Sequence, residues 1–266
     1  MKKLGIILIL IFLLLVVIHF VLSPKKNEFV ISDLYDEIIA RDKIKVGINI
    51  DSKPYGFIDK DGNYAGFNVD FARYIAQYLI HDRNKVEFIS VTPSNRLLKA
   101  STGEVDVVIS TVTITPQRKE IIDFSIPYDT AGQALLVKSN SKITSLKELA
   151  GQNVGVIFGT TAENSIRKLV PNANLLGYRS YKEAYIALKN DEINAITSDD
   201  TILNQFAIED SSVKLLPKRY SQEPYGIAFR KGDSSLKLKE NLDFAIKDLE
   251  QKKVLDRLKR KWNINF

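Results

Sequence analysis

The feature that most constrains the fold is a regular alternation of short apolar runs and amphipathic segments. In the first half of the chain, apolar runs at residues 45–50, 86–91 and 105–109 alternate with helical patterns at residues 69–80 and 94–101. Such alternation is typical of an α/β domain with a largely parallel sheet. We therefore expect an α/β lobe whose ligand site lies beyond the carboxyl ends of its strands.

The pattern then restarts, which predicts a second lobe. A strand predicted at residues 133–137 leaves the first lobe, and further strands, alternating with helices, are predicted at residues 153–157, 175–178, 195–197 and 213–216. Ser145 with Glu148 and Thr160 with Glu163 have the spacing of capping boxes at two helix starts. A last strand is predicted at residues 225–229, and residues 127–132 and 221–226 are the candidate crossings between the lobes.

Composition excludes several classes of protein. The chain has 266 residues and a formal charge of +6, but Lys2, Lys3, Lys25 and Lys26 flank the N-terminal apolar run. Without them, the 38 basic residues become 34 against 32 acidic ones, a balance that does not indicate nucleic-acid binding. There is no cysteine and there are two histidines, so we expect no disulfide, no metal, no cofactor and no thiol or histidine catalysis.

Residues 4–22 carry no formal charge and are long enough to span a bilayer. The end of this run lacks the small residues of a signal-peptide cleavage site, and Ser23 is followed by Pro24. This favours an uncleaved membrane anchor at residues 1–26, followed by a polar linker with a short helix at residues 27–42. Secretion after cleavage is the alternative, and both place the bulk of the chain outside the cytoplasm.

One arginine stands in an unusual position. Thr115 and Pro116 predict a helix start, which puts Arg118 in the first turn. A cation there opposes the helix dipole, unless an anion docks at the same place. We therefore expect Arg118 to bind a carboxylate; the alternative is a surface arginine paired with Glu120 or Asp123.

A series of short motifs, in a fixed order over residues 43–264, resembles the solute-binding proteins of polar amino-acid ABC importers. Each motif is weak alone, and their order and spacing carry the resemblance. They include Pro54-Tyr55-Gly56-Phe57, Gly66-Phe67-Asn68-Val69-Asp70, Thr113-Ile114-Thr115-Pro116-Gln117-Arg118, Asp123-Phe124-Ser125-Ile126-Pro127-Tyr128, Gly159-Thr160-Thr161, Thr197-Ser198-Asp199 and Pro224-Tyr225-Gly226-Ile227-Ala228-Phe229.

The resemblance implies a two-lobed periplasmic-binding-protein-like α/β fold with a hinge of two crossing strands. Lobe 1 would comprise residues 43–130 and 225–266, and lobe 2 residues 131–224. It also implies an extracytoplasmic, monomeric protein that is not an enzyme. Such a protein would capture a polar amino acid by lobe closure and deliver it to the membrane permease of an ABC importer.

The resemblance further implies roles for single residues. Arg118 would bind the α-carboxylate, and Asp199 would receive the α-ammonium. The remaining ligand-binding residues would be Thr113, Thr111, Thr160, Thr161, Tyr55 and Asn49. Asp199 and Thr160 have a second interpretation as helix caps, and Tyr55 has one as a core residue.

Arg96 bears on the identity of the amino acid. An arginine at this place resembles the form found in binders of acidic amino acids, which predicts glutamate or aspartate as the ligand. The match is incomplete, because several of those relatives carry a lysine where this chain has Asn49. An Asn-Arg pair such as Asn95-Arg96 also resembles members that take glutamine or cysteine, and Arg96 has a further interpretation as a structural residue.

Two other functions use the same fold. A cyclohexadienyl-dehydratase-like lyase would need an acid–base group in the cleft. An amino-acid sensor would need a partner chain to transmit the signal.

Overall fold

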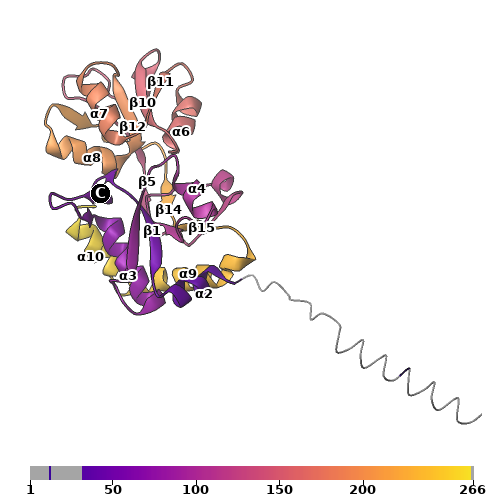
Figure 1. The fold of residues 1–266 in the computed structure, drawn as a ribbon. Helices are drawn as coiled ribbons and strands as arrows, with labels where there is room; N and C mark the ends of the chain where they lie inside the picture. The colour runs from indigo at the N-terminus through magenta and orange to yellow at the C-terminus, as the bar shows by residue number, and fades with distance from the viewer. Residues whose placement is uncertain (1–11, 13–31, 265–266) are drawn as a thin grey trace, which may run out of the picture. The chain divides into compact units, whose positions relative to one another are not determined.

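The computed structural model describes residue 12 and residues 32–264. Two five-stranded sheets, each flanked by helices, make up the body of residues 32–264 (Figure 1). We name the part built around the first sheet lobe 1 and the part built around the second sheet lobe 2. The predicted two-lobed α/β architecture is confirmed.

The sheet of lobe 1 has the strand order β5-β1-β6-β15-β7. Its central strand β1 pairs in parallel with β5 and β6, whereas β15 returns from the end of the chain and pairs antiparallel with β6 and β7. The strands are β1 (Ile44–Asn49), β5 (Val86–Val91), β6 (Val107–Val108), β7 (Ile122–Phe124) and β15 (Ala228–Arg230). Of the strand predicted at residues 105–109, only the middle pairs as β6.

Helices cover both faces of this sheet, and a small three-stranded sheet follows β1. The helices are α2 (Leu34–Arg41), α3 (Phe67–Ile80), α4 (Arg96–Ser101), α5 (Pro116–Lys119), α9 (Leu236–Gln251) and α10 (Val254–Lys261), with a 3₁₀ turn η2 (Asp233–Ser235). The small sheet consists of β2 (Asp51–Ser52), β3 (Gly56–Ile58) and β4 (Tyr64–Ala65). Helix α2 packs on α9 and buries Leu34 and Ile38, so this part of the predicted linker belongs to lobe 1.

Lobe 2 repeats the same design with the strand order β11-β10-β12-β9-β13. Its strands are β9 (Gln133–Lys138), β10 (Asn153–Ile157), β11 (Asn174–Tyr178), β12 (Ala195–Asp199) and β13 (Val213–Leu215). Its helices are η1 (Leu146–Leu149), α6 (Ala162–Leu169), α7 (Tyr181–Lys189) and α8 (Asp200–Glu209). The capping box predicted at Ser145 and Glu148 is present at η1.

Two strands cross between the lobes as a separate antiparallel pair: β8 (Asp129–Ala131) and β14 (Glu223–Tyr225). They coincide with the two predicted crossing segments. The single strand predicted at residues 225–229 is wrong, because Gly226 and Ile227 separate β14 from β15. This break lets the chain leave the hinge pair and enter the sheet of lobe 1.

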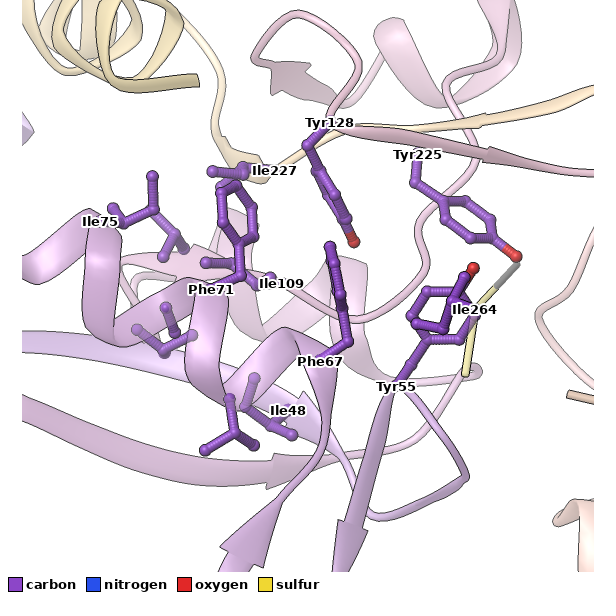
Figure 2. Close-up of a cluster of buried hydrophobic side chains, with 14 of the residues drawn as sticks. Ile48, Tyr55, Phe67, Phe71, Ile75, Ile109, Tyr128, Tyr225, Ile227 and Ile264 are labelled. Carbon is purple, nitrogen blue, oxygen red and sulfur yellow. The ribbon is translucent and has the colours of Figure 1, made fainter. Parts of the chain in front are cut away.

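An aromatic cluster joins the hinge to the core of lobe 1 (Figure 2). The Tyr55 ring lies edge-on to those of Phe67 and Tyr225, with centroids 5.9 and 5.6 Å away. The Tyr128 ring stacks on Phe67 at 6.3 Å. Tyr128 directly precedes β8 and Tyr225 is the last residue of β14, so this packing attaches both hinge strands to the core of lobe 1.

The predicted membrane anchor at residues 1–26 lies outside the described residues except for residue 12. Among the residues that the structure describes, no helix has both the length and the apolar character that crossing a membrane requires. The predicted boundaries of the lobes stay predictions.

Candidate functional site

Arg118 sits on the short helix α5, which begins as the sequence predicts. The Thr115 side chain accepts a hydrogen bond from the Arg118 amide (3.2 Å), and Pro116 occupies the first turn. The guanidinium donates through Nη1 to the Thr113 carbonyl (2.8 Å) and through Nη2 to the Gly159 carbonyl in lobe 2 (2.9 Å). Burial, together with the charge of Arg96, lowers the pKa of Arg118 to about 10. The side chain is therefore still a cation at neutral pH, and it reaches across both lobes.

Arg96 is a second cation beside it, and it is buried, whereas Arg118 is partly exposed. Its Nη1 donates to the carbonyls of Ser110 and Thr111, and Thr111 has a left-handed backbone with φ of 49°. Burial lowers the pKa of Arg96. Its Nε has no hydrogen-bond partner, so one donor of this buried guanidinium is available.

Asp199 ends strand β12 and precedes helix α8. It occupies the cap position of α8, but its side chain does not cap the helix. Instead, Asp199 Oδ2 accepts a hydrogen bond of 2.5 Å from the Tyr225 hydroxyl of the hinge. Burial raises the pKa of Asp199 to about 7, and the Glu223 charge acts in the same direction, whereas the Tyr225 hydrogen bond and Arg96 act against it. Asp199 is thus a carboxylate without a full counter-charge, which a ligand cation would supply.

Asn49 is the last residue of β1 and Asp51 is the first residue of β2; the sequence analysis missed Asp51. Asp51 Oδ2 accepts a hydrogen bond of 3.0 Å from the Tyr181 amide in lobe 2. Burial raises the pKa of Asp51, while the Tyr181 hydrogen bond, the neighbouring Asn49 side chain and, least, the charge of Arg96 lower it. Asn49 Nδ2 and Asp51 Oδ1 are both buried without a partner. The signal in the sequence was a carboxylate two residues after Asn49, at a strand end that was already assigned to the site.

Tyr55 lies in the core of lobe 1, with no exposed surface. Its hydroxyl donates to Asp129 Oδ2 of the hinge (2.8 Å), and that carboxylate also pairs with Lys259. These contacts correspond to the interpretation of Tyr55 as a core residue. A role in lining the ligand site stays a prediction.

The capping box predicted at Thr160 and Glu163 is wrong, because Thr161 precedes helix α6 and makes no side-chain cap. The Thr160 hydroxyl instead donates to the Ile157 carbonyl (2.8 Å). The Thr161 hydroxyl donates to Glu223 Oε2 (2.8 Å). Neither hydroxyl therefore has its hydrogen free for a ligand, which leaves main-chain groups as the means by which this turn could contact an anion.

The two lobes are in contact. The Arg118 and Asp51 hydrogen bonds cross between them, and Lys53 pairs with Glu209 of α8 at 3.2 Å. Gly159 has φ of 80°, and a Cβ atom added to it would lie 2.3 Å from the Pro93 carbonyl oxygen of lobe 1. Residues of both lobes also line a groove of about 510 Å³: Ile50, Asp51, Lys53, Phe57, Ile58, Lys182, Gln205, Phe206 and Glu209. This is a closed arrangement.

Three of the residues just described have a buried polar atom without a hydrogen-bond partner: Asn49 Nδ2, Asp51 Oδ1 and Arg96 Nε. The same holds for Gln133 Oε1 and Thr197 Oγ1, on the strands beside Asp199. Each such atom costs about 1–3 kcal/mol unless something pairs with it. The site therefore offers donors, acceptors, a cation and an anion to a small polar molecule. No group of three histidine, cysteine or acidic side chains placed to hold a metal occurs among the described residues.

Comparison with known proteins identifies the family. The bacterial extracellular solute-binding proteins of family 3 match residues 44–265. The chain belongs to this family. A relative named ABC transporter glutamine-binding protein GlnH, from Bacillus subtilis (strain 168), is 36% identical over 86% of this chain and 84% of its own length. A glutamine-binding protein from Geobacillus stearothermophilus is 39% identical over 74% of this chain and 76% of its own length.

Solved structures of the family agree with the fold. An ancestral amino acid-binding protein, AncCDT-1, described as a precursor of cyclohexadienyl dehydratase, superimposes with a TM-score of 0.79 at 34% identity. The match covers 86% of the present chain and 98% of the ancestral protein. Relatives named for arginine and cystine are similar as well. These findings support an amino-acid solute-binding role.

Proposed function

We propose that the protein captures a polar amino acid outside the cytoplasm by closure of its lobes and delivers it to an ABC importer. The observation that carries this proposal is the placement of Arg118 and Asp199. They come from different lobes, and the Arg118 guanidinium already donates to the Gly159 carbonyl of lobe 2. The charge of Asp199 partly offsets the lowering of the Arg118 pKa, in keeping with a short separation between the two groups. We infer that one small molecule contacts both.

The pair suits a zwitterion. The planar guanidinium of Arg118 is suited to the α-carboxylate, with the Thr113 and Thr111 region beside it. The Asp199 carboxylate is suited to the α-ammonium. Arg118 of lobe 1 donates to the Gly159 carbonyl of lobe 2, so the two lobes meet at this cation. Closure would therefore bring Arg118 and Asp199 to the same ligand, which an open state would not do. A ligand can shift the balance between two states only through such differential contacts.

For the ligand side chain, we propose glutamine ahead of glutamate or aspartate. Arg96 alone would favour a carboxylate, as sequence analysis predicts. However, the negative charge of the Asp51 carboxylate acts on Arg96 and already balances part of its positive charge. A second carboxylate would be repelled by Asp51. An amide would instead donate to Asp51 Oδ1 and accept from Asn49 Nδ2, the two unpartnered atoms.

A thermal-shift screen of the twenty amino acids tests this proposal. A ligand at a hundred times its Kd stabilises the folded protein by about 2.7 kcal/mol, so a binder is readily distinguished. We expect glutamine to give the largest shift. No shift with any amino acid would refute the function, and a larger shift with glutamate would refute only the side-chain assignment.

The variant Asp51→Asn tests whether Asp51 causes the proposed preference for glutamine over glutamate. Removing the negative charge should move the preference toward glutamate by roughly tenfold, as expected for about 1.4 kcal/mol of lost repulsion. Asp61→Asn is a matched control, since Asp61 is an exposed carboxylate of the neighbouring hairpin turn. An unchanged ratio of glutamine to glutamate affinity in Asp51→Asn would show that Asp51 does not face the ligand side chain.

A lyase on the same fold is the second candidate. A buried aspartate with a pKa near neutrality beside an arginine is typical of acid–base sites. Turnover of prephenate or arogenate by the purified protein would favour this function over transport. Binding of an amino acid without turnover would favour the first proposal.

We further propose that residues 1–26 anchor the protein to the cell membrane. The support is the uncharged run at residues 4–22 and the absence of a cleavage-site pattern after it. Mass spectrometry of the mature protein should find the unprocessed N-terminus. A mature chain that starts near residue 24 would show cleavage and release instead.

A further inference from the structure

Gln133 lies directly beside Asp199, although no motif points to it. It opens strand β9, and its partner in the antiparallel ladder with β12 is Asp199. Directly paired residues in such a ladder present their side chains on the same face, with Cβ atoms about 4.5–5.5 Å apart. Gln133 has no exposed surface. A buried amide therefore shares a face with the carboxylate to which we assign the ligand ammonium.

A chain of hydrogen bonds sets the direction of this amide. An ionised Glu223 can only accept hydrogen bonds, so the Thr161 hydroxyl donates its single hydrogen to Glu223 Oε2 (2.8 Å). The same hydroxyl must then accept from Gln133, which donates through Nε2 at 2.8 Å. The Ser221 hydroxyl donates to the other oxygen of Glu223 at 2.7 Å. The amide nitrogen is therefore fixed toward Thr161, which turns Gln133 Oε1 the other way.

That oxygen is buried without a hydrogen-bond partner. Thr197 Oγ1, two residues before Asp199 on the same face of β12, is also buried without one. An ammonium group carries three N–H donors in a compact head. Asp199 can satisfy one of them, so at least one more acceptor is needed beside it.

We propose that Gln133 Oε1 is a second acceptor for the α-ammonium of the ligand, held in place by Thr161 and Glu223. A neutral acceptor suits this place, because a further carboxylate would make Asp199 still harder to ionise. Thr161 then acts as a positioning residue through its hydroxyl and not as a ligand donor. This inference rests on the proposed amino-acid binding.

The test pairs a protein change with a ligand change. The probes are L-glutamine and its α-N-methyl derivative, which keeps the positive charge and loses one N–H. The wild-type protein should bind glutamine roughly ten times more tightly than the N-methyl compound, as expected when a hydrogen bond from a charged group is lost. In Gln133→Leu, which keeps a buried side chain of similar size, that preference should fall to about threefold or less.

Thr161→Val should have the same effect to a smaller extent, since the amide can then rotate. Gln133→Met serves as a second variant if Gln133→Leu is poorly folded. Equal weakening of both ligands by the Gln133 variants would overturn the proposal, because a merely structural role lowers both affinities together. Failure of the wild-type protein to bind any amino acid would refute the proposed function instead, so the two outcomes are distinguishable.

Discussion

The two charged groups of the candidate site are held in opposite ways. Arg118 stands on a four-residue helix, and its guanidinium is held by main-chain carbonyls from both lobes. Asp199 ends a buried strand of lobe 2 and is held by a side-chain hydroxyl of the hinge. The hydrogen bonds of the Arg118 guanidinium therefore depend on whether the lobes are closed. The protonation of Asp199 depends on pH and on its hydrogen bond to the hinge. Each of the following predictions tests one side of this difference.

The largest effect should come from the cation. Arg118→Ala would leave a ligand carboxylate buried without its partner, which costs about 3–5 kcal/mol, or more than a hundredfold in affinity. Isothermal titration calorimetry with the best ligand of the screen measures this loss. Arg167→Ala is the control, because Arg167 is an exposed arginine paired within helix α6. Near-wild-type affinity in Arg118→Ala would show that Arg118 does not bind the ligand carboxylate.

The anion should make binding depend on pH. The pKa of Asp199 is raised from its ordinary 3.8 to about 7 by burial, so in the ligand-free protein the carboxyl is largely protonated below pH 7. An ammonium ligand must displace that proton, so affinity should fall by up to about tenfold for each pH unit below 7. Tyr225→Phe removes the hydrogen bond that favours the ionised form and should move the midpoint to higher pH. A flat profile between pH 5 and 8 would contradict this.

Titration of Asp199 should have the opposite effect on the stability of the ligand-free protein, which should decrease as the pH rises. Between about pH 4 and 7 the folded protein holds a proton on Asp199 that the unfolded chain has released. This contribution to the free energy of unfolding is present below pH 4 and is lost as the pH rises through 7. Asp199→Asn should flatten that part of the stability curve, measured by urea unfolding without ligand.

Closure itself can be blocked at Gly159. Alanine there would place its Cβ 2.3 Å from the Pro93 carbonyl oxygen when the lobes meet. Such overpacking costs about 1–3 kcal/mol, so the affinity of Gly159→Ala should fall roughly tenfold. Gly151→Ala is a matched control, with a similar φ of 72° and no atom within 4 Å. It should lose thermal stability without losing affinity; an equal loss of affinity in both variants would mean that backbone strain alone is responsible.

The sequence predicted the parts of the molecule that depend on local chemistry. The α5 start follows from Thr115 and Pro116, and the alternation of strands and helices follows from apolar periodicity. It could not predict that Asp51 would reach Tyr181 or that Gln133 would lie beside Asp199, because these contacts join residues 130 and 66 positions apart. The capping box predicted at Thr160 failed for a local reason, since the Thr160 hydroxyl donates back to the Ile157 carbonyl and helix α6 begins one residue later than predicted.

The smallest effect should come from the exposed pair Lys53 and Glu209, which joins the lobes in the lining of the groove. Both side chains are 47% exposed, and surface pairs of this kind contribute only about 0.2–1 kcal/mol. Lys53→Met should therefore weaken ligand binding by less than about fivefold, and the effect should shrink further at high salt. The pair Arg167 and Glu163, which lies within lobe 2, is the control and should not affect affinity. If breaking the lobe-crossing pair lowered ligand-free stability as much as affinity, it would be an ordinary stabilising contact and not a contact of closure.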